Sequence, residues 1–88
     1  DRAEPVLIRD AKPVIPNTVE EGLSVSVTVV FTIDERGNVT DVQVSKSSGN
    51  KVIDRAVTDA VSRRKYEPAV QGGIPRSVKR TKTYSINT

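Results

Sequence analysis

Residues 23–33 read Leu-Ser-Val-Ser-Val-Thr-Val-Val-Phe-Thr-Ile, and the fold depends on this stretch. Its odd-numbered positions are all apolar, whereas its even-numbered positions are serine or threonine apart from Val30. Side chains along a strand point alternately to opposite faces, so this period of two predicts a strand with one apolar face. Strands that are covered on both faces tend to be apolar throughout, so the pattern favours an antiparallel sheet covered on one side.

The next segments supply a partner strand and a helix. Residues 34–38 form a turn-rich cluster in which Gly37 or Asn38 can take a positive φ, and residues 39–44 alternate again, which predicts a hairpin. Residues 47–50 offer several N-cap side chains. The period then becomes helical, with an apolar stripe made of Val52, Ile53, Ala56, Val57, Ala60 and Val61. We expect this helix to cover the apolar face of the sheet.

The expected surface and end of this helix follow from charge and from proline. Asp59 is spaced to pair with Arg55 and Arg63 at i,i+4, and Arg63-Arg64-Lys65 would lie in the last turn, where the helix dipole favours cations. Pro68 cannot continue the helical hydrogen bonds, and it disfavours helical geometry in the preceding residue. We therefore expect the helix to end before Pro68.

A loop at residues 71–75 precedes the last predicted strand, residues 76–86. This strand is basic on both faces, as is typical of an edge strand, and one parity holds Val78, Arg80, Lys82, Tyr84 and Ile86. A hairpin followed by a crossing helix places the last strand antiparallel beside residues 23–33. The predicted fold class is α+β, a three-stranded antiparallel sheet of order 2-1-3 with one long helix on one face.

The N-terminal segment is expected to be extended. Residues 1–16 hold three of the five prolines, and the residue before a proline is pushed away from helical geometry. Residues 17–22 combine an N-cap candidate, a glutamate three residues on and a final glycine, which favours a short N-terminal helix. We therefore expect an extended lead-in over residues 1–16 and a single domain over residues 17–88.

Composition weighs against catalysis. The chain has no histidine and no cysteine, which removes the usual general base, the thiolate nucleophile and the commonest transition-metal ligands. Asp34 and Glu35 lie in an exposed turn, where a perturbed pKa is not expected. We predict no enzymatic activity, no catalytic residue, no cofactor and no metal site. The chain starts without methionine, so we interpret it as a fragment or processed product, with any anchoring segment upstream.

An ordered series of motifs resembles the C-terminal domain of TonB energy-transducer proteins over roughly residues 8–88. The series comprises the alternating strand from Gly22 to Ile33, Asp34-Glu35-Arg36-Gly37-Asn38-Val39, Val42-Gln43-Val44, Ser47-Ser48-Gly49, Ile53-Asp54, Ala56, Ala60-Val61, Tyr66-Glu67-Pro68-Ala69 and Gly73-Ile74-Pro75. The resemblance implies a periplasmic domain of an inner-membrane-anchored protein. It also implies two partners, a proton-driven inner-membrane motor complex that acts through the missing N-terminal region and the box segment of outer-membrane transporters.

In the family the box segment adds as a strand to the edge of the last strand, which couples inner-membrane energy to the import of iron chelates and cobalamin-like ligands. The resemblance therefore implies partner-binding residues at Arg76, Ser77, Val78, Lys79, Arg80, Thr81, Lys82, Thr83 and Tyr84. A second contact segment, with a Pro-x-aromatic-Pro core in the family, corresponds to Pro13, Val14, Ile15 and Pro16. Two positions depart from the family, because Arg64 stands where tryptophan is usual and Ile15 where tyrosine is usual.

Other functions remain open at this level. Residues 63–88 hold seven basic residues and one acidic residue, which suits an acidic partner and raises the alternative of a nucleic-acid-binding module. The few aromatic residues argue against base stacking, so we expect no nucleic-acid partner. A TolA-like envelope interaction domain is a further alternative. An open edge strand also makes a homodimer possible.

Overall fold

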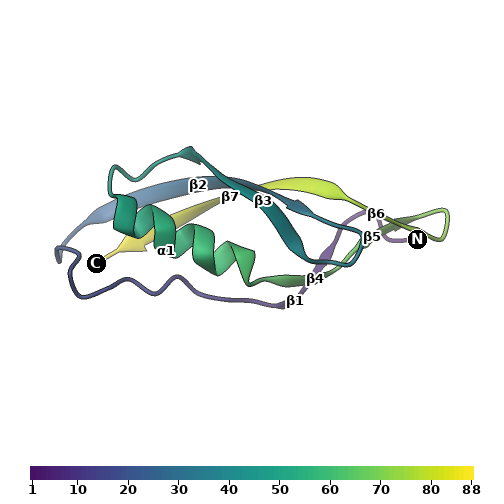
Figure 1. Ribbon diagram of the computed structural model, residues 1–88, viewed down its shortest axis with the longest axis horizontal. Coiled ribbons are helices and arrows are strands. Elements are labelled where there is room, and N and C mark those ends of the chain that lie inside the picture. Colours follow the sequence, from purple (N-terminus) through teal and green to yellow (C-terminus); the bar gives the residue numbers. More distant parts are fainter.

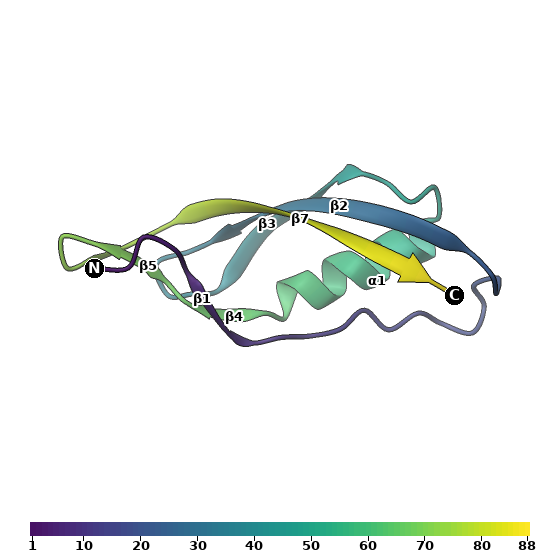
Figure 2. The same ribbon diagram turned by 180° about the vertical axis from the view of Figure 1, so that it is seen from behind.

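The computed structural model describes residues 1–88 and contains one helix and seven strands, arranged along a molecule of 49 × 21 × 16 Å (Figure 1). The elements are β1 (Val6–Arg9), β2 (Ser24–Ile33), β3 (Val39–Lys46), α1 (Lys51–Ser62), β4 (Lys65–Glu67), β5 (Ala69–Gln71), β6 (Ile74–Arg76) and β7 (Val78–Asn87). β2, β3 and β7 form an antiparallel sheet of order β3-β2-β7. α1 lies on one face of this sheet, and the predicted α+β class is confirmed (Figures 1 and 2).

The core lies between β2 and α1. The alternation in β2 is confirmed, because its buried side chains are Val27, Val29, Phe31 and Ile33. α1 contributes Ile53, Val57, Ala60 and Val61 from the predicted stripe. The stripe does not reach the core along its whole width, since Val52 is 43% exposed and Ala56 only half-buried. These two residues instead face the lead-in segment, which runs alongside α1.

Two polar side chains fix the N-terminus of α1. Asn50 is the N-cap, and its Oδ1 accepts hydrogen bonds from the N–H groups of Val52 and Ile53 at 2.9 and 3.2 Å. Asp54 in the first turn accepts from the hydroxyls of Ser47 and Ser48 and from the Ser48 N–H. Partial burial alone would raise the pKa of the Asp54 carboxyl, but these donors outweigh it and lower the pKa below its ordinary value. The charged carboxylate therefore joins the loop to the helix.

Asp54→Asn is expected to lower the free energy of unfolding by about 1 kcal/mol at pH 7, as the loss of a helix cap does. A depressed folded-state pKa stabilises the fold above the unfolded value of about 3.9, and this contribution disappears as pH falls through the folded-state pKa. The difference between the two proteins in urea unfolding should therefore shrink between pH 5 and about pH 2. Asp59→Asn, which breaks only the exposed pair with Arg63, should cost less than about 0.5 kcal/mol. Equal losses for both variants would contradict the role of Asp54.

The turn between β2 and β3 packs directly against β4. Gly37 is the positive-φ residue of this turn, at φ +82°, and it is buried. Its carbonyl accepts a hydrogen bond from the Tyr66 N–H at 2.9 Å. Lys65 adds a second link, because its Nζ donates to the Arg36 carbonyl at 2.6 Å. The hairpin and β4 are thus joined backbone to backbone.

The predicted short helix at residues 17–22 is wrong, because the structure has turns there. One backbone bond closes the first turn, from the Val19 N–H to the Pro16 carbonyl at 3.1 Å. Val19 is the only buried residue of this segment, so no apolar face exists for a helix to bury. Gly22, at φ +83°, then redirects the chain into β2.

α1 ends before Pro68, as expected, but the predicted last turn with Arg63-Arg64-Lys65 is wrong. The helix ends at Ser62 with Arg63 as C-cap, and no basic residue lies in its last turn. Lys65 begins β4, which pairs with β1 in the lead-in, so pairing with a distant strand replaces further helix. The expected Arg55–Asp59 pair is not formed, whereas the Arg63–Asp59 pair is, at 2.8 Å.

The region before the last strand differs from its prediction as well. The predicted loop at residues 71–75 forms most of a hairpin in which β5 pairs with β6 around Gly72 and Gly73, both at positive φ. Arg76 belongs to β6, Ser77 separates the strands, and the last strand runs from Val78 to Asn87. The hairpin projects at one end of the molecule (Figure 1).

Candidate peptide-binding edge

β7 presents a long, regular edge. It pairs with β2 over ten successive residues without a register shift, from Ser24↔Asn87 to Ile33↔Val78. No strand lies on its other side in the sheet. Figure 2 shows β7 along the near side of the molecule, from the β5-β6 hairpin to the C-terminus. An unpaired edge of this length is a template for main-chain pairing with another strand.

The opposite edge of the sheet is irregular. The β2–β3 pairing shifts register twice, between Thr28 and Val29 and between Val30 and Thr32. Asp41 in β3 has φ +53°, a left-handed conformation that breaks the extended backbone. Bulges bend and twist an edge strand and so discourage pairing. Of the two edges of this sheet, β7 is therefore the one suited to accept a strand.

The hydrogen-bond alternation identifies which groups of β7 point outward. The Thr88 N–H donates to the Leu23 carbonyl at 2.8 Å. Leu23 and Thr88, which continue the β2–β7 ladder one step past Ser24↔Asn87, are therefore a hydrogen-bonded pair. In an antiparallel ladder every second pair has this character. The residues between them direct their N–H and carbonyl groups to the free edge, and these are Lys79, Thr81, Thr83, Ser85 and Asn87.

The same alternation divides the side chains of β7 between the two faces. Thr81 and Thr83 are exposed on the uncovered face of the sheet, where the Thr83 hydroxyl lies 2.9 Å from that of Thr28. Arg80, Lys82 and Tyr84 are half-buried on the face that carries α1. The predicted site residues from Val78 to Tyr84 thus share one edge but belong to two faces.

A largely buried guanidinium lies beneath β7. The side chain of Arg64 is 11% exposed, and its Nε donates to Asp10 Oδ1 at 3.0 Å while Nη1 donates to Tyr66 Oη at 2.7 Å. The Ala11 N–H, and then Arg64 beside it, lower the pKa of the Asp10 carboxyl. Arg64 therefore ties the lead-in to the end of α1.

Tyr84 completes this polar cluster. Its hydroxyl is buried without a hydrogen-bond partner, and burial raises its pKa above the ordinary value. Lys82 Nζ lies 5.0 Å from the centre of the Tyr84 ring, which is within cation–π range. The hydroxyl of Tyr84 is thus a donor without a partner beneath the edge strand.

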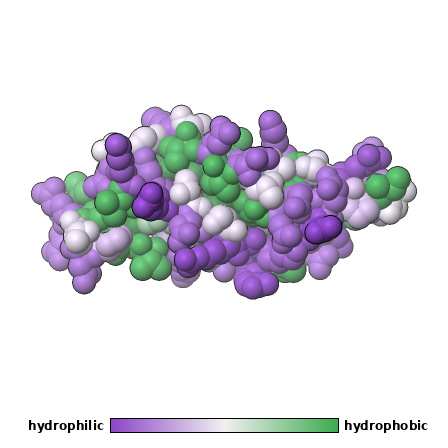
Figure 3. Space-filling view, in the orientation of Figure 1, coloured by the Kyte–Doolittle hydropathy of each residue, from purple (hydrophilic) through white to green (hydrophobic).

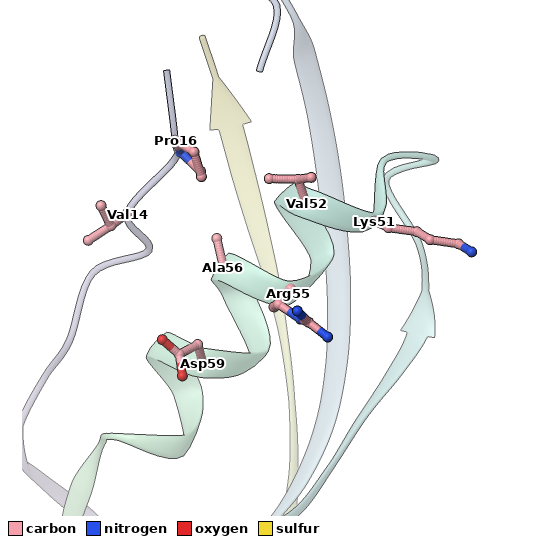
Figure 4. A pocket seen from close by; sticks show the side chains of 7 residues that line it. All are labelled: Val14, Pro16, Lys51, Val52, Arg55, Ala56 and Asp59. Carbon is pink, nitrogen blue, oxygen red and sulfur yellow. The ribbon is translucent and has the colours of Figure 1, made fainter. Parts of the chain in front are cut away.

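The second predicted contact segment, residues 13–16, is part of the lead-in, and its side chains line two different pockets. Ile15 and Pro16 share a pocket of about 320 Å³ with Asn87 and Thr88 at the end of β7. Val14 and Pro16 border a groove of about 710 Å³, and Figure 4 shows Val52 and Ala56 of α1 on its opposite side. The structure therefore brings Ile15 and Pro16 to the C-terminal end of the candidate edge, whereas Val14 faces α1.

The structure adds edge and pocket residues to those predicted. Ser85 and Asn87 extend the edge beyond Tyr84, and Glu4 pairs with Arg80 from the far end of the chain. The predicted strand over residues 76–86 already included Ser85, whereas Asn87 lies one residue beyond it. Nothing local in the sequence pointed to Glu4 or Arg64, because they reach β7 only through the tertiary fold.

Other kinds of site find little support in the side chains. No group of three or more histidine, cysteine, aspartate or glutamate residues is placed to hold a metal ion. α1 has 12 residues and is too short and too polar to cross a bilayer. Apolar groups on the face shown in Figure 3 are interrupted by hydrophilic residues. The free edge of β7 therefore remains the best-supported candidate site.

Comparison with known proteins agrees with this architecture. The model of the family described as Gram-negative bacterial TonB protein C-terminal matches residues 16–86. The chain belongs to this family. The match supports a TonB domain over the TolA-like alternative. A solved structure, the solution NMR structure of the Pseudomonas aeruginosa TonB C-terminal domain, superposes with a TM-score of 0.80 at 30% identity, covering 96% of this chain and 86% of that one.

Two curated relatives carry the name Protein TonB. The one from Pseudomonas aeruginosa is 36% identical over 67 residues, which cover 75% of this chain and 20% of that protein. The one from Xanthomonas campestris pv. campestris is 36% identical over 58 residues, which cover 66% of this chain and 26% of that protein. The chain thus spans about a fifth to a quarter of the length of these relatives.

Proposed function

We propose that this chain is the periplasmic receptor-binding domain of an energy transducer, and that it binds an extended box segment of an outer-membrane transporter by strand addition to β7. The observation that carries this proposal is the unbroken ten-residue edge of β7, in contrast to the bulged β3 at the opposite edge of the sheet. Family membership supports it. An inner-membrane anchor, a motor complex and the import of iron chelates or similar ligands belong to the same proposal.

Strand addition needs main-chain groups rather than special side chains. The N–H and carbonyl groups of Lys79, Thr81 and Thr83 would pair with the incoming segment. The cations along β7 would attract an acidic segment and speed its encounter in a salt-dependent way. Nucleic acid is a poor fit for this surface, because Tyr66 is buried and Tyr84 half-buried, which leaves no exposed aromatic pair for stacking.

Thr81→Pro is expected to weaken binding of a transporter box peptide at least about tenfold, since proline removes an outward N–H and hinders close approach of the partner. The fold should persist, because that N–H makes no bond within the sheet. Thr81→Ala keeps the N–H and should bind nearly as the unmodified chain does. Peptide titration followed by amide NMR shifts measures both affinity and position, with the shifts expected along Val78–Asn87. Shifts confined to α1 or β3 would refute strand addition at this edge.

A further inference from the structure

A cationic pocket opens beneath the free edge of β7. Its volume is about 270 Å³, and its lining includes Pro5, Phe31, Arg64, Tyr66, Arg80 and Lys82. Phe31 and Tyr66 form an apolar floor, with ring centroids 6.5 Å apart. Arg80 and Lys82 come from β7 itself, so the pocket and the proposed binding edge are continuous.

Cations outnumber carboxylates in and around this pocket. Arg64 is paired with Asp10, and Arg80 is paired with Glu4. Lys82 makes no salt bridge and lies over the Tyr84 ring. Three cations therefore face two carboxylates, and one of these, Glu4, is 75% exposed and held by a single ion pair. A surface ion pair of this kind contributes about 0–1 kcal/mol, so a competing carboxylate can displace it.

An added strand would direct alternate side chains into this pocket. Arg80 and Lys82 belong to hydrogen-bonded pairs with β2, so on the free side their opposing residues form non-hydrogen-bonded pairs, in which side chains lie closest. Residues of the added strand opposite Arg80 and Lys82 thus project toward the pocket. Their sequence neighbours project to the uncovered face, beside Lys79 and Thr81.

We propose that the pocket beneath β7 selects a partner strand with an acidic side chain at an inward-facing position, where it takes the place of Glu4 on Arg80 and reaches Lys82. This inference rests on the proposed function, because it requires strand addition to β7. It goes further because it assigns the selection of an acidic side chain to Arg80 and Lys82. It also proposes that Glu4 occupies, in the free chain, the position that this side chain takes in the complex.

Two peptides of equal composition test the proposal. Each has nine residues in which threonines alternate with valines, and the valines fix which face turns inward, because a one-residue slip would move every valine to the other face. In the inward isomer, glutamate replaces one valine. In the outward isomer, that glutamate and an adjacent threonine exchange places. The inward isomer is expected to bind about fivefold tighter, as a favourable cross-strand charge pair predicts.

Variants of the chain separate the pocket from general electrostatics. Arg80→Gln should reduce the preference for the inward isomer to less than about twofold, because the facing cation is lost. Lys79→Gln removes the same charge from the uncovered face, beside the outward glutamate, so it should weaken the outward isomer at least as much as the inward one and should not reduce the preference for the inward isomer. Glu4→Gln removes the internal competitor and should strengthen only the inward isomer, by about twofold.

The outcomes distinguish this inference from the function beneath it. If both isomers shift the β7 amides with equal affinity, strand addition holds and the pocket has no selectivity. If the Glu4→Gln chain gains no affinity for the inward isomer, Glu4 does not occupy the ligand position. If neither these isomers nor a transporter box peptide shifts the β7 amides, strand addition itself fails.

Discussion

Replacing Gly37 with alanine is expected to lower the free energy of unfolding by about 3 kcal/mol or more, a large part of the stability of a domain of this size. A Cβ built on Gly37 would lie 1.8 Å from the backbone carbonyl oxygen of Tyr66. No side chain can rotate to relieve that contact, so the hairpin turn would have to move away from β4. The Tyr66 N–H to Gly37 carbonyl bond would break with it. Alanine would also pay for a left-handed φ of +82°.

Gly22→Ala is the matched control for this prediction. Gly22 has almost the same φ, +83°, but no atom lies within 4 Å of the Cβ position. Its loss should be limited to the conformational cost, about 1 kcal/mol. Urea unfolding of both variants, followed by circular dichroism, measures the difference. If the two variants are equally stable, the close approach of the turn to β4 contributes nothing.

Phe31→Ala is expected to cost about 3–5 kcal/mol, the usual range for removing a buried aromatic ring. Phe31 is 2% exposed in β2 and is the only phenylalanine in the chain. It packs near Tyr66, and it opposes Arg80 across the β2–β7 ladder. The substitution therefore removes both the middle of the core and the floor of the pocket beneath β7. With so few large side chains, the core has little means of filling the cavity.

The adjacent residue provides the comparison. Val30 lies on the opposite face of the same strand and is half-buried. Val30→Ala should cost less than about 1 kcal/mol, because it changes strand propensity without opening a cavity in the core. Thermal and urea unfolding of both variants measure the contrast. Similar losses would mean that the uncovered face of the sheet stabilises the fold as much as the packed face does.

The elements that the sequence predicts well are those whose own residues determine how they pack. β2 shows its period over a whole strand, and each of its deeply buried side chains is one of the odd-numbered residues. The core residues of α1 all come from the predicted stripe, and Asn50 is one of the expected caps. Local pattern and tertiary burial agree in these two elements, which together form most of the core.

The failures lie in strands too short to show a pattern of their own. β1 and β4 exist only because they pair with each other across a long stretch of the chain, and β5 and β6 have three residues each, although they form a local hairpin. Lys65 to Glu67 therefore leave the predicted helix once the lead-in is in place. Residues 17–22 show the reverse case, since their capping signals are present but only Val19 has a core to enter. Capping alone does not offset the cost of helix nucleation.

The candidate site divides in the same way. The predicted edge residues from Val78 to Tyr84 lie on one continuous free edge, and the basic character of the strand pointed to that location. The pocket beneath it joins Glu4, Arg64 and Arg80, which are separated by up to 76 positions in the chain. A sequence pattern of period two carries no information about tertiary contacts between residues so far apart in the chain. Only the path of the lead-in across the sheet reveals it.

The unequal edges of the sheet also set how large an assembly can grow. A protein with two matching open edges can stack without end into fibrils, as cross-β structures do. Here β7 is continuous, whereas β3 is interrupted by register shifts and by the left-handed Asp41. Pairing through β7 consumes the one regular edge of the sheet, so it stops at two chains, whether the second is a transporter segment or another copy. Under the proposed strand addition, the domain would therefore bind one segment at a time.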